Sequence, residues 1–307
     1  MPGTLSVLLR NRKVVIGLVI IAIYLLVAIF GPWLTEHAPL QRVARPHQPP
    51  SDEHFLGSTR MGRDVFTQLI WGTRTSLFVG VLAGFIITAI GTMLGILAGY
   101  VGGWVDEVIN FFTNVALVIP QLPLLLVIAA FLGQSSPMVI ALIIGLTSWA
   151  WGARVTRAQT MSLRQREFVQ ASELTGEPLW RMALVVLMPN LLSIIGFNFI
   201  GSVTYTIITQ ATLEFLGLGD PMSVSWGNML FNAQVTSAIT VGAWWELIVP
   251  AGAIALIGVG LALLNFGIDE ISNPRLRTLG SLNKAVKLQR QLDKQRAAAY
   301  TQGNAAP

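Results

Sequence analysis

Long apolar segments alternate with shorter polar segments along most of the chain. A helix that crosses a membrane needs roughly 20 predominantly apolar residues, at about 1.5 Å of rise per residue. Six segments approach or exceed this length: residues 14–34, 77–100, 108–132, 136–153, 191–213 and 247–268. The pattern therefore predicts an all-α polytopic membrane protein with six transmembrane helices.

Two features interrupt this pattern. Pro120 and Pro123 lie inside the third segment and predict a break or kink, because each proline removes a helix hydrogen bond. Residues 221–245 carry no charge but contain many Ser, Thr, Asn and Gln side chains. They predict a re-entrant or surface scoop rather than a seventh lipid-facing helix. Six spans place both termini on the same side of the membrane.

The predicted spans divide the chain into three parts. Residues 1–75 form an N-terminal anchor helix and an outer loop. Residues 76–268 form the transmembrane core, which includes a charged loop at 154–190 and the outer scoop, taken as 213–245. Residues 269–307 form a C-terminal tail that is basic and then rich in Ala and Gln, a composition that suits either an amphipathic surface helix or a disordered chain.

Composition and charge refine the picture. Apolar residues make up 53% of the 307 residues and charged residues only 11%, which excludes an ordinary soluble domain. Cysteine is absent, so disulfides and thiolate metal sites are excluded. Of the 20 Lys and Arg residues, 15 fall on the side of the two termini and of the 154–190 loop. The positive-inside rule therefore predicts that this side is cytoplasmic, and the basic residues indicate topology rather than nucleic-acid binding.

Several kinds of chemistry have no support in the sequence. No ionisable side chain lies inside a predicted span, although ion-coupled carriers commonly keep one at membrane depth. All three histidines fall between the first two spans, and the chain lacks the G-x-x-x-x-G-K-[ST] loop that binds ATP. We expect a membrane protein that is not an enzyme and has no cofactor or metal of its own. An ion-coupled secondary carrier and a non-transporting scaffold are the alternatives.

Glycine and tryptophan recur at informative positions. Gly91, Gly95 and Gly99 are spaced four apart, which places them on one helix face where a second backbone can approach closely. This spacing predicts helix packing, with a sliding surface along a translocation path as the alternative. Five tryptophans lie near predicted span ends and are interpreted as interface anchors rather than as sugar-stacking groups: Trp33, Trp104, Trp151, Trp244 and Trp245.

The loop at 154–190 is a charged island in an otherwise apolar chain. Residues 166–181 have helical spacing, in which Phe168, Ala171 and Ser172 share one face. Gly176 is expected to end this short helix, and Pro178 suits the start of the next. Two short helices around a glycine predict a compact knob that projects from the membrane, whereas a solvated loop is the simpler alternative.

The knob carries part of a known family pattern. Residues 170–189 resemble the signature loop of binding-protein-dependent ABC importer permeases, which reads Glu-Ala-Ala, three residues, Gly, nine residues, Ile, one residue, Leu-Pro. The corresponding residues here are Gln170, Ala171, Ser172, Gly176, Val186, Met188 and Pro189. Further stretches resemble the second permease type of dipeptide, oligopeptide and nickel importers: FLGSTRMGRDV at 55–65, WGTRTSL at 71–77, LEFLGLG at 213–219, SWGNML at 225–230 and NPRL at 273–276.

This resemblance, which covers residues 5–277, implies a type I ABC importer permease in a bacterial or archaeal cytoplasmic membrane. It implies a second homologous permease, two ATPase subunits that bind ATP and Mg, and an extracytoplasmic solute-binding protein as partners, in a lipid bilayer and without nucleic acid. The knob is then the coupling helix that docks on an ATPase, through Arg166, Glu167, Gln170, Ala171, Ser172, Glu173, Gly176 and Pro189. The scoop is expected to face the binding protein through Gly217, Gly219, Trp226 and Gly227.

The resemblance also bears on cargo and on one departure from the family pattern. Family cargoes are mostly peptides, with nickel and oligosaccharides in some branches. The segments at 217–221 and 265–275 resemble the oligosaccharide-associated branch. Gln170 stands where the family has Glu, which removes one charge from the expected contact, and Glu167 or Glu173 can supply it.

Overall fold

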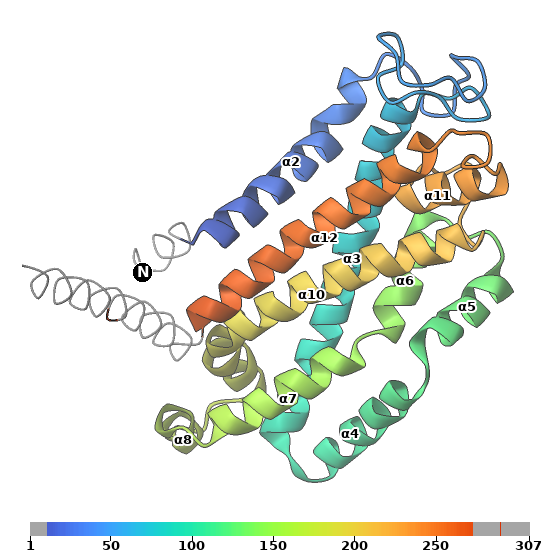
Figure 1. Ribbon diagram of the computed structural model, residues 1–307. Helices are drawn as coiled ribbons and strands as arrows, with labels where there is room; N and C mark the ends of the chain where they lie inside the picture. Colours follow the sequence, from blue (N-terminus) through green and yellow to red (C-terminus); the bar gives the residue numbers. More distant parts are fainter. Residues whose placement is uncertain (1–10, 273–288, 290–307) are drawn as a thin grey trace, which may run out of the picture.

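A single long helix, α3 (Val65–Val101), runs through the middle of the molecule (Figure 1). Its 37 residues correspond to about 55 Å at 1.5 Å per residue, which exceeds the roughly 30 Å of a bilayer core. The computed structural model describes residues 11–272 together with residue 289. Within these residues every regular element is a helix, so the all-α prediction is confirmed.

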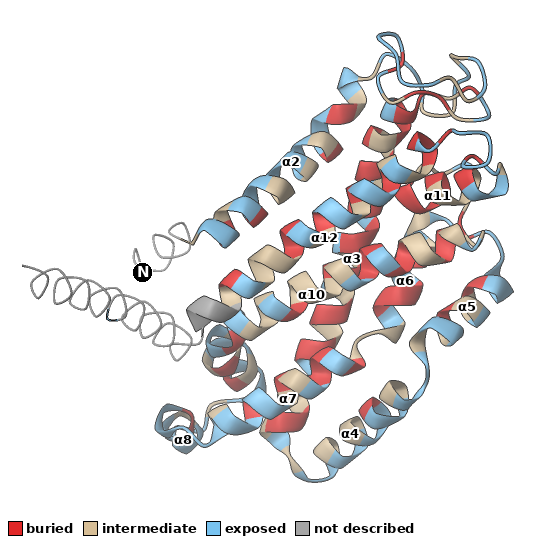
Figure 2. Ribbon diagram, viewed as in Figure 1, coloured by how far each residue is buried: buried red, intermediate tan, exposed pale blue. Residues whose placement is uncertain are grey.

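The other helices surround α3 in chain order. They are α2 (Arg12–Leu34), α4 (Gly103–Val118), α5 (Gln121–Leu132), α6 (Pro137–Thr147), α7 (Ala150–Arg164), α8 (Glu167–Leu174), α9 (Leu179–Arg181), the π-helix η1 (Met182–Leu187), α10 (Met188–Phe215), α11 (Trp226–Val235) and α12 (Trp245–Ser272). The interior lies along α3 and α6, whereas α2, α4 and α5 expose much of their surface (Figure 2).

The predicted spans are present, but two of them are broken. Four helical stretches are long and apolar enough to cross a membrane: α2, α3, the continuous run Leu179–Phe215, and α12. The third predicted span is the pair α4 and α5, bent by 83°, and the fourth is the pair α6 and α7, bent by 42°. Counting each bent pair as one span gives six. The first break falls at Ile119 and Pro120, because Pro120 disfavours helical geometry in the preceding residue.

Three predicted boundaries are wrong. Helix α3 begins at Val65, 12 residues before the predicted span, so the boundary drawn at residue 75 lies inside a helix. Its start is fixed by Asp64, whose carboxylate accepts from the backbone N–H of Thr67 at 2.7 Å. The loop predicted at 154–190 is mostly helical, because α7 continues to Arg164 and helical structure resumes at Leu179. Polar helical turns outside the membrane leave no mark on an apolar pattern.

The two ends of the molecule are distinct. The described ends of α2 and α12 lie at the same end as α8, and the loop before α3 lies at the opposite end with α11 (Figure 1). Both termini therefore approach the end that carries α8. The tail at 273–307 lies outside the described residues except for residue 289, as do residues 1–10. That this end is cytoplasmic stays a prediction from the distribution of basic residues.

The close packing of α3 depends on glycine. A Cβ added to Gly95 would lie 2.8 Å from the carbonyl oxygen of Ala153 and 2.6 Å from the Cβ of Thr156, both on α7. Gly91 and Gly99 also face the α7 backbone, and on the neighbouring stretch Gly80 and Gly84 face α10. The structure thus places the glycine face directly against α7, where only a residue without a side chain fits.

We predict that Gly95→Ala destabilises the fold by about 1–3 kcal/mol, because the added methyl group must push α3 and α7 apart. Thermal unfolding of the detergent-solubilised chain measures this change. Gly258→Ala in α12 is the matched control, since no atom lies within 4 Å of its added Cβ. It should be neutral or slightly stabilising, because alanine favours helix. Equal unfolding temperatures for the two variants would contradict the packing account.

Candidate translocation cavity, coupling helix and outer clamp

A cavity of about 260 Å³ opens where the two broken spans meet α3 and α10. Gln121 begins α5 directly after the first break, and Ser148 lies in the second break, between α6 and α7. The Gln121 amide Nε2 donates to the Ser148 hydroxyl at 2.6 Å, so one hydrogen bond joins the two breaks. Irregular backbone at membrane depth is tolerated only where it is buried in protein or lines a cavity, and this cavity meets that condition.

The polar side of the cavity comes from one face of α10. Asn198, Ser202 and Tyr205 follow one another at helical spacing and line the cavity together. The lining is completed by Ile87, Gln121, Ser148, Trp151, Gly152, Phe197 and Gly201. It offers amide and hydroxyl groups and aromatic rings but no charged side chain. Such a surface suits an uncharged polar segment of a solute.

This cavity was not predicted from the sequence. Only ionisable groups were sought inside the spans, whereas Gln121, Asn198 and Ser202 are neutral polar residues within apolar segments. Trp151 was assigned to a span end and interpreted as an interface anchor. It instead lines the cavity, because α6 and α7 continue as one bent span on either side of the break next to it.

At the far end, helix α8 projects from the bundle as a short knob. Val169 is its buried anchor and packs in an apolar cluster with Ile96 of α3 and with Met182, Leu187 and Leu191 of the η1–α10 region. The predicted inward face was wrong, since Phe168 and Ala171 are exposed. A single Val is sufficient to seat a helix of eight residues, and the rest of its surface remains available.

Most of the predicted coupling residues lie on this exposed surface. Arg166, Glu167, Gln170, Ala171 and Glu173 are exposed, whereas Ser172 is half-buried and bonds back to the Phe168 carbonyl. Gly176 has φ +75°, a left-handed conformation that ends α8. Pro189 lies apart from the knob, in the first turn of α10 directly after η1. The structure therefore gathers seven of the eight predicted residues on or beside α8.

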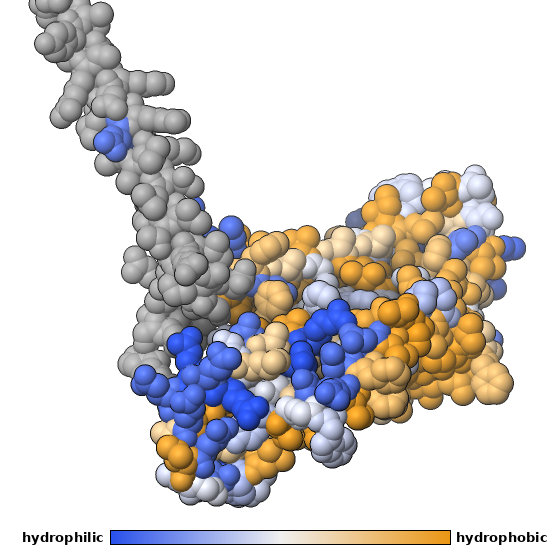
Figure 3. Space-filling model, turned by 90° about the horizontal axis from the view of Figure 1, so that it is seen from below, coloured by the Kyte–Doolittle hydropathy of each residue, from blue (hydrophilic) through white to orange (hydrophobic). Residues whose placement is uncertain are grey.

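Ion pairs fix several island arginines inside the chain. Arg157 makes a bidentate pair with Asp106 of α4, with N···O distances of 2.5 and 2.6 Å, and Arg154 donates to Asn114 at 2.6 Å. These contacts tie α4 to α7. Arg164 lies 3.9 Å from Glu173, and Arg181 pairs with Glu177 at 2.8 Å. Hydrophilic side chains gather on this end of the molecule beside a broad apolar surface (Figure 3).

At the opposite end, the scoop is clamped onto the bundle. Trp226 is fully buried and meets the ring of Tyr24 of α2 edge to face, with centroids 5.6 Å apart. Gly219 and Gly227 are also buried, and Gly217 is half-buried with φ +84°. Three of the four residues expected to face a partner thus serve internal packing. The exposed apolar side chains around them are Met222, Val235, Ile239, Val241 and Trp244.

A buried carboxyl group lies at the centre of this clamp, contrary to the expectation that the spans contain no ionisable group. Helix α10 continues two residues past the predicted span and includes Glu214, which is fully buried. Its two oxygens accept from the Ser225 hydroxyl at 2.6 Å and from the Gln210 amide at 3.0 Å. A Cβ on Gly227 would lie 2.5 Å from the same carboxyl group, so the glycine is required for this close approach.

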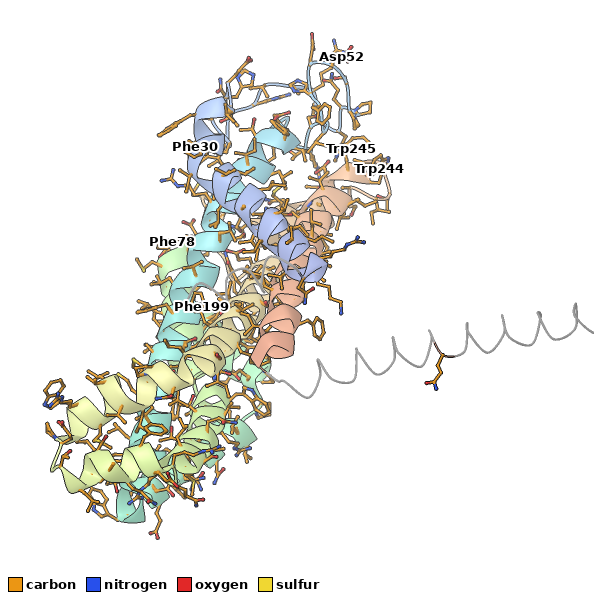
Figure 4. The ribbon with its side chains drawn as sticks, turned by 90° about the vertical axis from the view of Figure 1, so that its left-hand side faces the viewer. Phe30, Asp52, Phe78, Phe199, Trp244 and Trp245 are labelled. Atoms are coloured by element: carbon orange, nitrogen blue, oxygen red, sulfur yellow. The ribbon has the colours of Figure 1, made fainter. Side chains whose placement is uncertain are left out.

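The outer loop is attached to the same end. His47 lies 2.6 Å from Glu246 at the start of α12, and the indole of Trp245 donates to the Ser58 carbonyl at 3.1 Å. The Ser58 hydroxyl in turn donates to the Arg45 carbonyl at 2.6 Å. The loop and the scoop therefore form one connected outer face, in which Asp52, Trp244 and Trp245 lie close to the same end (Figure 4).

Helices of membrane length, a polar cavity at two breaks and a projecting helix at one end define a multi-pass permease. Residues 91–278, more than half of the chain, match the family described as binding-protein-dependent transport system inner membrane component. Residues 4–50 match the N-terminal transmembrane domain of oligopeptide transport permease C. The chain therefore belongs to this family of ABC importer permeases, as its motifs predicted.

Two curated relatives span nearly the whole chain. The dipeptide transport system permease protein DppC of Bacillus subtilis (strain 168) is 33% identical over 271 residues, which cover 87% of this chain and 83% of that protein. The oligopeptide transport system permease protein OppC of the same organism is 30% identical over 269 residues, which cover 87% of each. The resemblance to the dipeptide and oligopeptide permeases is confirmed.

We predict that Glu214→Ala loosens the scoop. The substitution leaves the Ser225 hydroxyl and the Gln210 amide buried without their acceptor, at about 1–3 kcal/mol for each. A cysteine in place of the buried Ala233 reports the opening of α11 through its rate of thiol labelling, since the chain has no other cysteine. Labelling should accelerate in Glu214→Ala and stay unchanged in Glu107→Ala, an exposed carboxylate on α4. Identical rates in both would show that Glu214 does not hold the scoop.

Proposed function

We propose that this chain is one of two permease subunits that form the path of an ATP-driven importer for dipeptides or oligopeptides. The polar, uncharged cavity at the two helix breaks is the observation on which the proposal rests. In this assignment the cavity is a section of the path at membrane depth. The second permease completes the path, and an extracytoplasmic binding protein delivers the solute to the outer face.

The chemistry of the cavity favours peptides. The amides of Gln121 and Asn198 both donate and accept hydrogen bonds, as peptide groups do, and no charge selects one side chain over another. The names of the DppC and OppC relatives point to the same cargo. An oligosaccharide is the second candidate, because Trp151 gives the cavity an aromatic surface and the end of α12 resembles that branch.

The energy source is assigned to separate ATPase subunits that dock on α8. Arg166, Glu167 and Gln170 are exposed there and make no ion pair with the described residues. Since Glu173 lies near Arg164, Glu167 is the free carboxylate that replaces the charge missing at Gln170. Val169 then transmits movement of α8 to α3 and α10 through its apolar cluster. This assignment places α8 and both termini in the cytoplasm.

At the other end, the exposed apolar side chains of the scoop and the outer loop are assigned to the binding protein. They include Met222, Ile239 and Trp244 of the scoop and Phe55 and Met61 of the loop. The buried Glu214 does not argue for an ion-coupled carrier, because both of its oxygens already accept hydrogen bonds within the clamp.

Reconstitution in vesicles tests the proposed function. The chain, the second permease, the ATPase subunits and the binding protein are combined, and uptake of a labelled dipeptide is compared with that of a labelled oligosaccharide. Peptide uptake should require ATP and the binding protein and should persist after the proton gradient is collapsed. Uptake that needs only the gradient would identify a secondary carrier, and uptake of the sugar alone would overturn the peptide assignment.

We predict that Ser202→Trp blocks the path. An indole placed on the cavity face of α10 fills much of the 260 Å³, so uptake should fall close to background. The binding protein should still stimulate ATP hydrolysis, because the substitution is remote from α8. Ser193→Trp is the matched control, since Ser193 lies on an exposed face of the same helix. Normal uptake by Ser202→Trp would remove the cavity from the path.

We predict that Gly176→Leu uncouples ATP hydrolysis from uptake. A side chain at φ +75° costs about 1–2 kcal/mol, and relief of this strain reshapes the turn after α8. Uptake per ATP should fall about 5- to 30-fold. Gly133→Leu is a close control, with φ +76° and, as at Gly176, no atom within 4 Å of an added Cβ, but in the loop between α5 and α6. An equal loss in both variants would argue against docking at α8.

A further inference from the structure

A second, larger hollow lies on the side of the bundle away from the translocation cavity. It is a groove of about 1000 Å³ between α2 and α3, with Phe199 of α10 at its floor. Figure 4 looks at this side and shows Phe30 of α2, Phe78 of α3 and Phe199 of α10 around the space between these helices. The groove shares no lining residue with the cavity at the helix breaks.

The walls of the groove are apolar along most of its length. On α3, Phe78, Val81 and Phe85 follow one another at helical spacing, and all three are exposed. On α2, Leu25 and Ile29 form the opposite wall and are exposed as well. A surface of this kind is filled by hydrocarbon in a membrane.

One cation is placed at the outer end of the same stripe. Arg74 lies one turn before Phe78 on α3 and lines the groove with an exposed side chain. Within residues 11–272 its guanidinium makes no hydrogen bond or ion pair. Trp33 and Trp71 lie beside it, and the Trp71 indole donates to the Thr35 hydroxyl at 3.2 Å. Tryptophan and arginine at one level are typical of the membrane–water interface.

The length of the groove matches one leaflet of a bilayer. Arg74 and Phe85 are 11 residues apart, which corresponds to about 16 Å along the helix. Half of the hydrocarbon core is about 15 Å. With Arg74 at headgroup level, Phe85 therefore lies near the bilayer midplane, where an acyl chain ends.

We propose that this groove is a binding site for an anionic phospholipid of the outer leaflet, with its phosphate on Arg74 and an acyl chain between α2 and α3. The guanidinium presents a planar fork that binds phosphate through two parallel hydrogen bonds. A helix of the second permease is a poorer occupant, because it would cover Arg74 with apolar side chains and leave a buried charge without a partner. The proposal does not depend on the cargo of the transporter.

Native mass spectrometry of the full chain tests this site. Phosphatidylglycerol is titrated against the detergent-purified protein, and phosphatidylcholine with the same acyl chains serves as the uncharged comparison. Wild type should retain phosphatidylglycerol preferentially, and Arg74→Gln should bind it about tenfold more weakly, as expected for one charge-assisted contact. Arg45→Gln removes the same charge from an exposed position in the outer loop and should bind normally.

Two further variants separate the alternatives. Val81→Trp fills the middle of the groove and leaves Arg74 intact, so it should also lose the lipid. Phe78→Cys gives a single thiol, since the chain has no other cysteine, and it should not crosslink to the second permease in the assembled transporter. Equal binding of both lipids by wild type, unchanged binding by Arg74→Gln or by Val81→Trp, or an efficient crosslink from Phe78→Cys would each overturn the proposal.

Discussion

The close approach of α3 to its neighbours is the constraint on which the rest of the structure depends. In a membrane, lipid tails are as apolar as the side chains, so helices associate through tight packing rather than through exclusion of water. Glycines at every fourth position let the α3 backbone touch α7 along one stretch and α10 along another. Because α7 carries α8 and α10 lines the cavity, this one helix face positions both functional ends of the chain.

Helix α7 connects the two regions directly. It begins at the break beside Ser148 and runs for 15 residues to Arg164, where the chain turns into α8. The bidentate pair between Arg157 and Asp106 attaches α4 to it, and α4 ends at the other break. A displacement of α8 therefore reaches both breaks through rigid helices, and the hydrogen bond from Gln121 to Ser148 is the point where the two routes meet.

Local features were predictable from the sequence, and tertiary ones were not. The apolar spans, the break at Pro120 and the glycine face follow from residue type and spacing alone. The start of α3 at Val65 does not, because a helix outside the membrane needs no apolar stripe. Nor does the cavity, since Gln121, Ser148 and Asn198 come from separate elements whose inward faces depend on packing. For the same reason Val169 was missed as the anchor of α8, and Trp226 was wrongly placed at a surface.

The π-helical turn η1 has a geometrical consequence for the cavity. Its backbone bonds run from i to i+5, so every side chain after it is rotated relative to an uninterrupted α-helix. One residue of register corresponds to about 100° of rotation, more than a quarter of a turn. The face on which α10 presents Asn198, Ser202 and Tyr205 is therefore determined at Met182–Leu187, beside the apolar seat of α8. The orientation of the polar cavity wall is thus set by helical phase at the opposite end of the same helix.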